Sequence, residues 1–344
     1  MQTANLITGL SLSILSGIML GSFALPQKRI KVWQWENYWG TFTFFSAFLF
    51  PFIVAYITNP AFFKIIDSTP AHILLTVFLF GVTWGIANIG YGLSIKKLGM
   101  ALAFAIVLGM NNIVGTIAPL IINHPEKLTE PVGRWIMAGV AIMLVGILFS
   151  SIAAKVRDGE LKKSESTKSK ESDKSTLSGG ILIAIAAGIL AASFNFALIA
   201  GKPIEKIAME YGTQLNNASN ITWFVGLSGG FIVTMIYCSI LLKRNNTFSL
   251  FYSKESSKAW LITLTMGILW FGGVVLYGVS VNRLGTLGAS IGWPVIQSVS
   301  IGSANLLGLL TGEFKGAKKS IKWVVFSLLS LTIGICIIGY AGSL

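Results

Sequence analysis

In the most apolar stretches of this chain, the side chains that could bind a ligand are neutral amides and aromatic rings. Trp84, Asn88 and Tyr91 stand at positions i, i+4 and i+7, which places them on one face of a helix. Trp270 and Tyr277 repeat the outer pair at the same spacing. An amide donates and accepts hydrogen bonds, and an aromatic face stacks on the C–H groups of a sugar ring. Residues of these types favour a neutral polyol as ligand.

Further amides occur on the neighbouring apolar stretches. An amide in hydrocarbon is costly unless it is paired, so each of these side chains must face protein or water. Hydrogen bonding between helices is the alternative to a ligand site for any single amide. Their grouping favours a site. The predicted substrate-binding residues are Trp84, Asn88, Tyr91, Asn111, Asn112, Asn195, Trp270, Tyr277, Trp293 and Gln297.

The groups that catalysis would need are missing from the apolar stretches. No Asp, Glu, Lys, Arg or His lies away from their ends, and the sequence has no H-E-x-x-H pattern, metal-ligand cluster or P-loop. We therefore expect no enzyme, no metal site, no cofactor and no use of ATP by this chain alone.

Proton coupling would require a titratable group. The nearest candidates are Glu36, at the start of the second apolar stretch, and Lys202, at the end of the sixth. Each has a simpler interpretation. Glu36 is also a first-turn carboxylate favoured by the helix dipole, and Lys202 is also an end residue that extends towards water.

One motif occurs twice. Residues 81–99 read GVTWGIANIGYGLSIKKLG and residues 267–285 read GILWFGGVVLYGVSVNRLG, with seven identities at a single offset of 186 (81 to 267). A weaker match pairs residues 17, 22 and 23 with 188, 193 and 194, at an offset of 171 (17 to 188). Such internal repeats predict a membrane bundle built from two related halves.

Composition places these motifs in a membrane. The 344 residues are 53% hydrophobic and 11% charged, with a mean hydropathy of +0.74, whereas soluble domains carry about 25% charged residues. We predict an all-α membrane protein with ten transmembrane helices. Their ranges are 4–24, 37–58, 72–95, 99–122, 133–153, 178–201, 218–242, 259–282, 286–310 and 322–342.

Basic residues predict the orientation. The 26 Lys and Arg residues divide into 20 on one side of the predicted membrane and six on the other. The basic side should be cytoplasmic, so both termini are expected outside. The third and eighth helices then run in opposite directions, which predicts inverted five-helix repeats over 1–153 and 178–344. The Lys/Ser/Glu-rich segment 154–177 between them is expected to be a flexible cytoplasmic linker. The net charge is +13, and the basic residues that give it lie in the segments between the apolar stretches. We therefore expect a lipid bilayer, and no nucleic acid, as partner.

Three stretches carry a resemblance to a known family: KRIKVWQWENYWG at 28–40, FLFGVTWGIANIGYGLSIKKLGM at 78–100 and IVGTIAPLIIN at 113–123. They resemble the L-rhamnose–proton symporter family of the drug/metabolite transporter superfamily. The resemblance implies a multi-pass protein of the bacterial inner membrane with a cavity between inverted halves. It also implies functional roles for Trp84, Asn88, Tyr91, Glu36 and Lys202. The family has an acidic residue early in the ninth helix. This chain has none there and reads GTLGASIGWPVIQ.

These observations predict a secondary active transporter that imports a neutral deoxysugar, L-rhamnose, together with protons. A small neutral sugar and the proton are then its partners. Two alternatives stay open at this stage. One is an exporter of drugs or metabolites from the same superfamily, and the other is a membrane sensor that binds sugar without moving it.

Overall fold

The computed structural model describes residues 3–98, 100–164 and 174–344, and it is helical throughout this part of the chain, with no strand. Its elements in chain order are α1 (Thr3–Ser22), η1 (Leu25–Arg29), α2 (Trp35–Phe44), η2 (Phe45–Leu49), α3 (Phe50–Thr58), α4 (Phe62–Ser68), α5 (Ala71–Leu98), α6 (Met100–Asn123), η3 (Pro125–Leu128), α7 (Pro131–Ser164), α8 (Lys174–Ala191), α9 (Ser193–Ala200), α10 (Lys202–Glu210), α11 (Leu215–Asn245), η4 (Phe248–Tyr252), α12 (Ser256–Leu284), η5 (Gly285–Leu287), α13 (Gly288–Leu310) and α14 (Lys318–Ser343).

Within the described ranges, nine segments are long and apolar enough to cross a bilayer. One of them spans 55 residues, 256–310, and contains α12 and α13 joined by the single turn η5. Long apolar side chains cover the outer faces of the bundle, as Ile57, Leu182 and Leu310 show, each more than two-thirds exposed. Water does not favour such a surface, whereas lipid does. The protein is therefore a multi-pass membrane protein.

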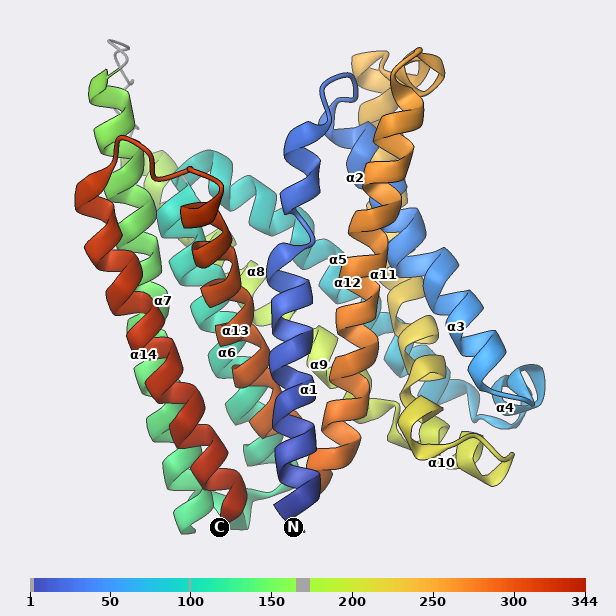
Figure 1. Cartoon of the computed structure of the whole chain (residues 1–344). Helices are drawn as coiled ribbons and strands as arrows, with labels where there is room; N and C mark the ends of the chain where they lie inside the picture. Colours follow the sequence, from blue (N-terminus) through green and yellow to red (C-terminus); the bar gives the residue numbers. More distant parts are fainter. Residues whose placement is uncertain (1–2, 99, 165–173) are drawn as a thin grey trace.

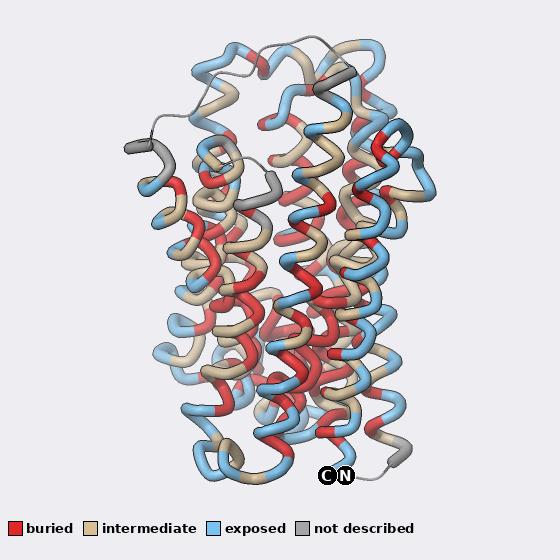
Figure 2. The backbone as a smooth tube through the Cα atoms, turned by 90° about the vertical axis from the view of Figure 1, so that its left-hand side faces the viewer, coloured by how far each residue is buried: buried red, intermediate tan, exposed pale blue. Residues whose placement is uncertain are grey.

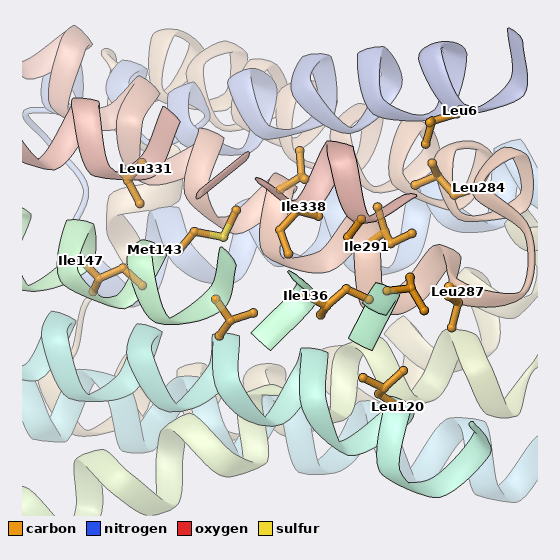
Figure 3. Packing of buried hydrophobic residues seen from close by; sticks show 14 residues of the cluster. Leu6, Leu120, Ile136, Met143, Ile147, Leu284, Leu287, Ile291, Leu331 and Ile338 are labelled. Atoms are coloured by element: carbon orange, nitrogen blue, oxygen red, sulfur yellow. The ribbon is translucent and has the colours of Figure 1, made fainter. Parts of the chain in front are cut away.

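The helices form an elongated bundle in which α1 begins and α14 ends at the same end (Figure 1). The short helix α10 also lies at this end, and η1 lies at the opposite end. Buried residues gather on the inward sides of the helices, while exposed residues follow the outside and both ends (Figure 2). The largest apolar cluster joins α7 and α14 to α1, α6, α12 and α13, through residues such as Met143, Ile291 and Ile338 (Figure 3).

Two of the spans are interrupted. In the second, the π turn η2 separates α2 from α3 just before Pro51. Proline lacks the backbone N–H and its ring crowds the carbonyl four residues earlier, so a wider turn accommodates it. In the sixth, α8 ends at Ala191 and α9 starts at Ser193. Ser193 Oγ donates to the Leu190 carbonyl oxygen at this break. Because α9 starts at Ser193, Asn195 lies in its first turn.

Glycines allow the helices to approach closely. A Cβ added to Gly81 on α5 would lie 1.6 Å from the carbonyl oxygen of Gly226 on α11. The glycine at 285, which ends α12, has φ of +75°, a conformation that residues with a side chain rarely adopt. Both positions therefore depend on the absence of a side chain.

One such contact occurs twice in the chain. A Cβ at Gly9 would lie 2.6 Å from Leu284 Cγ, and a Cβ at Gly180 would lie 2.6 Å from Leu98 Cδ2. Gly9 and Gly180 are separated by the offset of 171, and Leu98 and Leu284 by the offset of 186. The two sequence offsets therefore relate the same pair of touching positions.

The linker expected over 154–177 falls partly on residues 165–173, which lie outside the described residues. Its flanks are helical, because α7 continues to Ser164 and α8 begins at Lys174. Arg157 explains part of this extension, since its guanidinium contacts Asp158 at 2.9 Å and Glu313 at 3.3 Å. These contacts fix a turn of α7 that composition alone predicts to be flexible.

Replacing Gly81 by Ala should destabilise the protein, because the new methyl group overlaps the α11 backbone. Overpacking of this kind costs about 1–3 kcal/mol, so the thermal unfolding temperature of the purified protein should fall. Gly92→Ala on the same helix is the control, since no atom lies within 4 Å of the added Cβ. Equal unfolding temperatures for the two variants would show that α5 and α11 are not in contact at Gly81.

Candidate functional site

Aromatic rings from five helices meet in the middle of the bundle. The rings of Trp84 on α5 and Trp270 on α12 lie 5.5 Å apart between centroids. Phe194 of α9 contacts Trp84 at 5.3 Å and stacks on Trp223 of α11 at 4.7 Å. We call this group, with Tyr277 and Trp293, the aromatic cluster. The two equivalent tryptophans of the repeated motif therefore meet in this cluster, where Phe194 contacts both of them.

Amides hold the cluster to its neighbours. Tyr277 Oη donates to Asn195 Oδ1 at 2.5 Å, and Asn195 Nδ2 donates to the Gly115 carbonyl oxygen at 2.7 Å. Trp293 Nε1 donates to the Asn111 carbonyl oxygen at 3.2 Å. The close approach of Trp293 requires the glycine, since a Cβ at Gly115 would lie 2.2 Å from Trp293 Nε1. Six of the ten predicted binding residues thus lie in or against the cluster: Trp84, Asn111, Asn195, Trp270, Tyr277 and Trp293.

The other four predicted binding residues lie apart from these contacts. Tyr91 packs on Val107, Ala184 and Ala187, on the side towards α6 and α8. Asn112 is buried, and its Oδ1 accepts a hydrogen bond of 3.4 Å from Thr116 in the same helix. Asn88 and Gln297 are half-buried. The single helical face that we predicted for Trp84 and Tyr91 is therefore divided between two neighbours.

Polar atoms on α11 were missed by the sequence prediction. Asn216 Oδ1, Ser219 Oγ and Trp223 Nε1 are buried and have no hydrogen-bond partner among the described residues. They stand at i, i+3 and i+7 on one face, and Ser219 and Trp223 lie against Gly278 of α12. Buried groups of this kind call for an explanation. The sequence signal for these atoms was the polar run NNASNITW at 216–223, which leads into the predicted span 218–242.

The aromatic cluster is closed. The free space between Trp84, Phe194 and Trp223 is about 10 Å³, which is no more than a single water needs. The rings therefore fill one another's space in this conformation.

A cavity of about 410 Å³ borders the cluster on the side of α10. It lies between the end of α6, α9, the end of α12 and the start of α13, and its apolar wall includes Val281 and Ala289, which also belong to the buried core around the cluster. Such a volume falls in the range of small-molecule sites, about 300–1,000 Å³. Its polar groups include those of Asn123, His124, Lys202, Asn282, Thr286 and Ser290.

Lys202 joins two helices at this cavity. Its Nζ lies 3.0 Å from Glu205 Oε2 on α10 and donates to Asn282 Oδ1 on α12 at 2.5 Å. The Glu205 side chain is 3% exposed, whereas that of Lys202 is 43% exposed. The sequence prediction missed Glu205 because its helix lies beyond the predicted sixth span. The Lys202–Glu205 spacing of i, i+3 was the available signal.

Glu36 lies far along the bundle from this cavity, at the start of α2. Its carboxylate is buried and accepts hydrogen bonds from Asn245 Nδ2 at 2.9 Å and Thr247 Oγ1 at 2.7 Å. Both donors belong to the end of α11 and the turn after it. Glu36 therefore ties the start of α2 to the end of α11.

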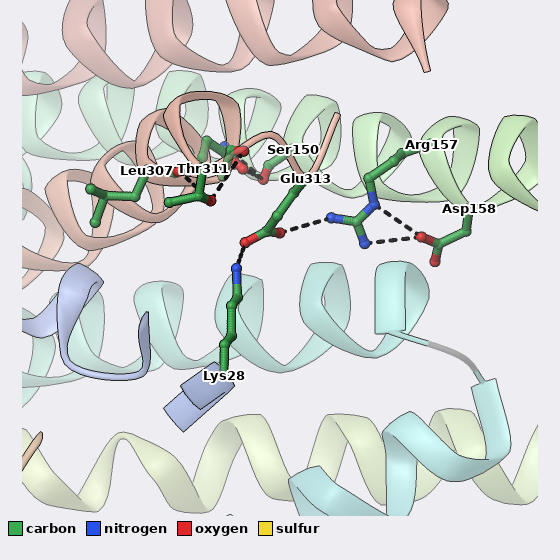
Figure 4. Close-up of polar contacts among 9 residues, drawn as sticks. Lys28, Ser150, Arg157, Asp158, Leu307, Thr311 and Glu313 are labelled. Carbon is green, nitrogen blue, oxygen red and sulfur yellow. Dashed lines mark hydrogen bonds and ion pairs between the residues drawn. The ribbon is translucent and has the colours of Figure 1, made fainter. Parts of the chain in front are cut away.

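Ion pairs join the helices at the end opposite the cavity. Lys28 after α1 and Arg157 on α7 both contact the Glu313 carboxylate in the turn after α13 (Figure 4). Nearby, Asn305 Nδ2 donates to Ser150 Oγ at 2.9 Å. A second cavity, of about 300 Å³, lies at this end between Arg29, Lys31 and Glu255, so each end of the bundle has both a cavity and cross-helix polar contacts.

A helical membrane bundle with a cavity at one end, lined by apolar and polar side chains and bordered by aromatic rings halfway along, has the architecture of a transporter. Comparison with known proteins identifies the kind. The model of the L-rhamnose-proton symport protein family matches residues 1–343, and the chain belongs to this family.

Similar curated proteins agree along the whole length. The chain is 28% identical over 342 residues to proteins described as L-rhamnose-proton symporters from Yersinia pestis (strain Pestoides F) and Yersinia pseudotuberculosis serotype O:1b (strain IP 31758). In both cases the alignment covers 97% of this chain and 97% of the relative. The family is one of transporters and not of enzymes.

Glu36→Ala should lower the stability of the protein, because the buried Thr247 hydroxyl and the more exposed Asn245 amide lose their acceptor. An unsatisfied buried hydrogen-bonding group costs about 1–3 kcal/mol, which thermal unfolding of the purified protein would detect. Glu36→Gln keeps an acceptor oxygen and should be close to wild type. If Glu36→Gln were instead folded normally but abolished proton movement during uptake, Glu36 would be a proton carrier and not an anchor.

Proposed function

We propose that this protein imports L-rhamnose together with protons across the bacterial inner membrane. The observation that carries the proposal is the cavity beside the aromatic cluster, in a chain that its family matches from end to end. Aromatic faces suit the C–H surface of a sugar ring, while amide and hydroxyl groups suit its hydroxyls. The absence of acidic and basic side chains from the cluster suits a neutral solute.

The proposal includes ten spans in two inverted halves, with both termini outside. The repeated contacts of Gly9 with Leu284 and of Gly180 with Leu98 support it. Helix packing supports it too, because α1 packs on α12 and α13 while α8 packs on α5 and α6. In the proposed repeat α1 is equivalent to α8, α12 to α5 and α13 to α6, so the two sets of contacts correspond. The contact of Trp84 with Trp270 is what a two-fold axis through the middle of the bundle requires. This architecture is also the basis for placing the family in the drug/metabolite transporter superfamily.

The proposed mechanism of transport is alternating access. On the proposed topology the cavity faces the outside, and the contacts of Glu313 with Lys28 and Arg157 hold the cytoplasmic end together. Rocking one half against the other would break these pairs and close the cavity.

The sugar must part the aromatic cluster on its way through. In the proposed path it first occupies the cavity and then separates Trp84, Trp270 and Trp293. The unpartnered atoms of Asn216, Ser219 and Trp223 would then find acceptors and donors on the sugar. Asn88, Tyr91, Asn111, Asn112, Asn195, Tyr277 and Gln297 stay in the proposal as residues that line the path once the cluster opens.

For proton coupling, the position of Lys202 at the cavity supports a role, whereas the contacts of Glu36 support an anchoring role. An exporter and a sensor are the other functions considered, and a family of symporters favours neither. Cells that express the protein should accumulate labelled L-rhamnose, and a protonophore should abolish the accumulation because no proton gradient remains to drive it. Accumulation that persists with the protonophore would exclude proton symport, and binding without any transport in liposomes would identify a sensor.

Trp84→Ala should reduce L-rhamnose uptake to the level of cells that lack the protein. The substitution removes the ring that contacts both Trp270 and Phe194, so the cluster can neither seal nor stack on the sugar. Initial rates with labelled L-rhamnose provide the measurement, and quantification of the protein in membranes shows whether it is present. Trp135→Ala is the control, since Trp135 is exposed on α7 and packs on Tyr340 away from the cluster. Wild-type rates in the Trp84 variant would place the sugar path elsewhere.

A further inference from the structure

We propose that Glu205 binds the coupling proton and that it acts on the sugar through Lys202. The inference rests on the proposed function and adds the residue that links the two substrates. Glu205 is a positioning residue here, because its partner Lys202, and not its own carboxylate, reaches the cavity.

The environment of Glu205 is unusual for a carboxylate at the end of a helix. It lies in the first turn of α10, whose Ile204 and Ala208 pack with Ile65 of α4 and Ile221 of α11 in one buried apolar cluster. Glu205 Oε2 contacts Lys202, while Oε1 is buried and has no hydrogen-bond partner among the described residues. Burial favours the neutral form of a carboxyl group and the nearby ammonium favours the charged form. A site with such opposed influences can exchange a proton.

Other charged groups near α10 do not compensate for Glu205. Lys64 and Asp67 lie on α4, and Arg283 follows Asn282 on α12, but in the described part of the chain Glu205 forms an ion pair with Lys202 alone. Across the cavity, His124 faces Glu126 at 3.6 Å. The ammonium of Lys202 is therefore the charge that responds when Glu205 gains or loses a proton.

Lys202 connects this carboxylate to the cavity and to α12. Its ammonium contacts Glu205 and donates to Asn282 Oδ1, and Asn282 Nδ2 donates to the Leu215 carbonyl oxygen at 3.1 Å. Lys202, Asn282 and the start of α13 border the same cavity. The ammonium of Lys202 has three N–H groups, and Glu205 and Asn282 accept from two of them. Sugar hydroxyls that accept from more than the third would compete with Glu205 for Lys202.

This competition couples the two substrates. When Glu205 takes a proton from water that reaches the cavity, its neutral carboxyl group holds the ammonium less strongly. Lys202 then donates to a sugar hydroxyl, so protonation raises the affinity for the sugar. Linkage requires that the sugar raises the affinity for the proton by the same factor. For symport, the proton returns to water on the cytoplasmic side, after the protein has opened there and the sugar has left, and the ion pair then forms again.

A purely structural role predicts something different. A first-turn carboxylate often stabilises a helix through its dipole, and such a group would affect stability without linking sugar binding to pH. The unpartnered oxygen and the position of Lys202 at the cavity argue for the coupled role. Proton uptake on sugar binding separates the two, because a helix cap would not change it.

The test measures L-rhamnose binding to the purified protein by titration calorimetry, from about pH 5 to 8, in buffers of different ionisation enthalpy. The wild-type protein should bind L-rhamnose more tightly at acid pH, by a factor of about 5–150 as is typical of coupled sites, and should take up a proton on binding. Glu205→Gln should bind with an affinity that does not depend on pH and without proton uptake. Proton uptake that persists in Glu205→Gln with normal sugar binding would overturn the proposal.

Two further variants keep the result interpretable. Glu210→Gln, at the exposed end of the same helix, should behave as wild type. Lys202→Gln should also lose proton uptake, because the link to the sugar is cut, and it decides the question if Glu205→Gln does not fold. Retained proton uptake in Lys202→Gln would equally overturn the proposal. A wild-type protein that neither binds nor transports L-rhamnose would reject the proposed function itself, an outcome distinct from an unchanged Glu205 variant.

Discussion

A polar atom inside an apolar bundle must find its partner within the protein, and this constraint shapes the structure at every level. No water in the bilayer core can take that place. Tyr277 donates a hydrogen bond to the side chain of Asn195, which in turn donates to the Gly115 carbonyl oxygen. Ser280 Oγ donates to the Gly9 carbonyl oxygen where α1 meets α12. Each pair also fixes the position of one helix against another. The atoms that stay unpaired among the described residues, including those of Asn216, Ser219 and Trp223 on α11, then mark where a ligand could supply the missing partner.

The repeated motif allowed the sequence to predict much of this arrangement. Helices occupy all the predicted span ranges, and the equivalent residues Trp84 and Trp270 do meet. The repeat identifies Trp84 and Trp270 as equivalent positions, and the structure brings their rings together in the aromatic cluster. Tyr91 shows the limit. Spacing alone placed it on the face of Trp84, but a long helix with two neighbours divides that face, so Tyr91 packs towards α8.

The closed cluster and Glu205 could not be predicted, for a different reason. Whether aromatic rings enclose a ligand or fill one another's space depends on the conformational state, which the sequence does not specify. Burial of Glu205 depends on how α10 packs on α4 and α11, and these helices are distant in sequence. The sequence shows an acid beside a lysine in a polar segment, which usually means a solvated turn. Only tertiary packing turns that pair into a buried carboxylate beside a cavity.

The chemistry of a neutral sugar explains why the coupling residue would lie at the rim. A charged group in the middle of the bundle would be expensive to bury and would have no charged partner on the sugar. The protein instead lines its centre with rings and amides and holds its ionisable pair, Lys202 and Glu205, at the end of the cavity. Lys202 there lies within reach of both the wall of the cavity and the buried acid. No acidic residue lies in the first turn of α13. On our proposal none is needed there, because Glu205 in the first turn of α10 provides the carboxylate that proton symport requires.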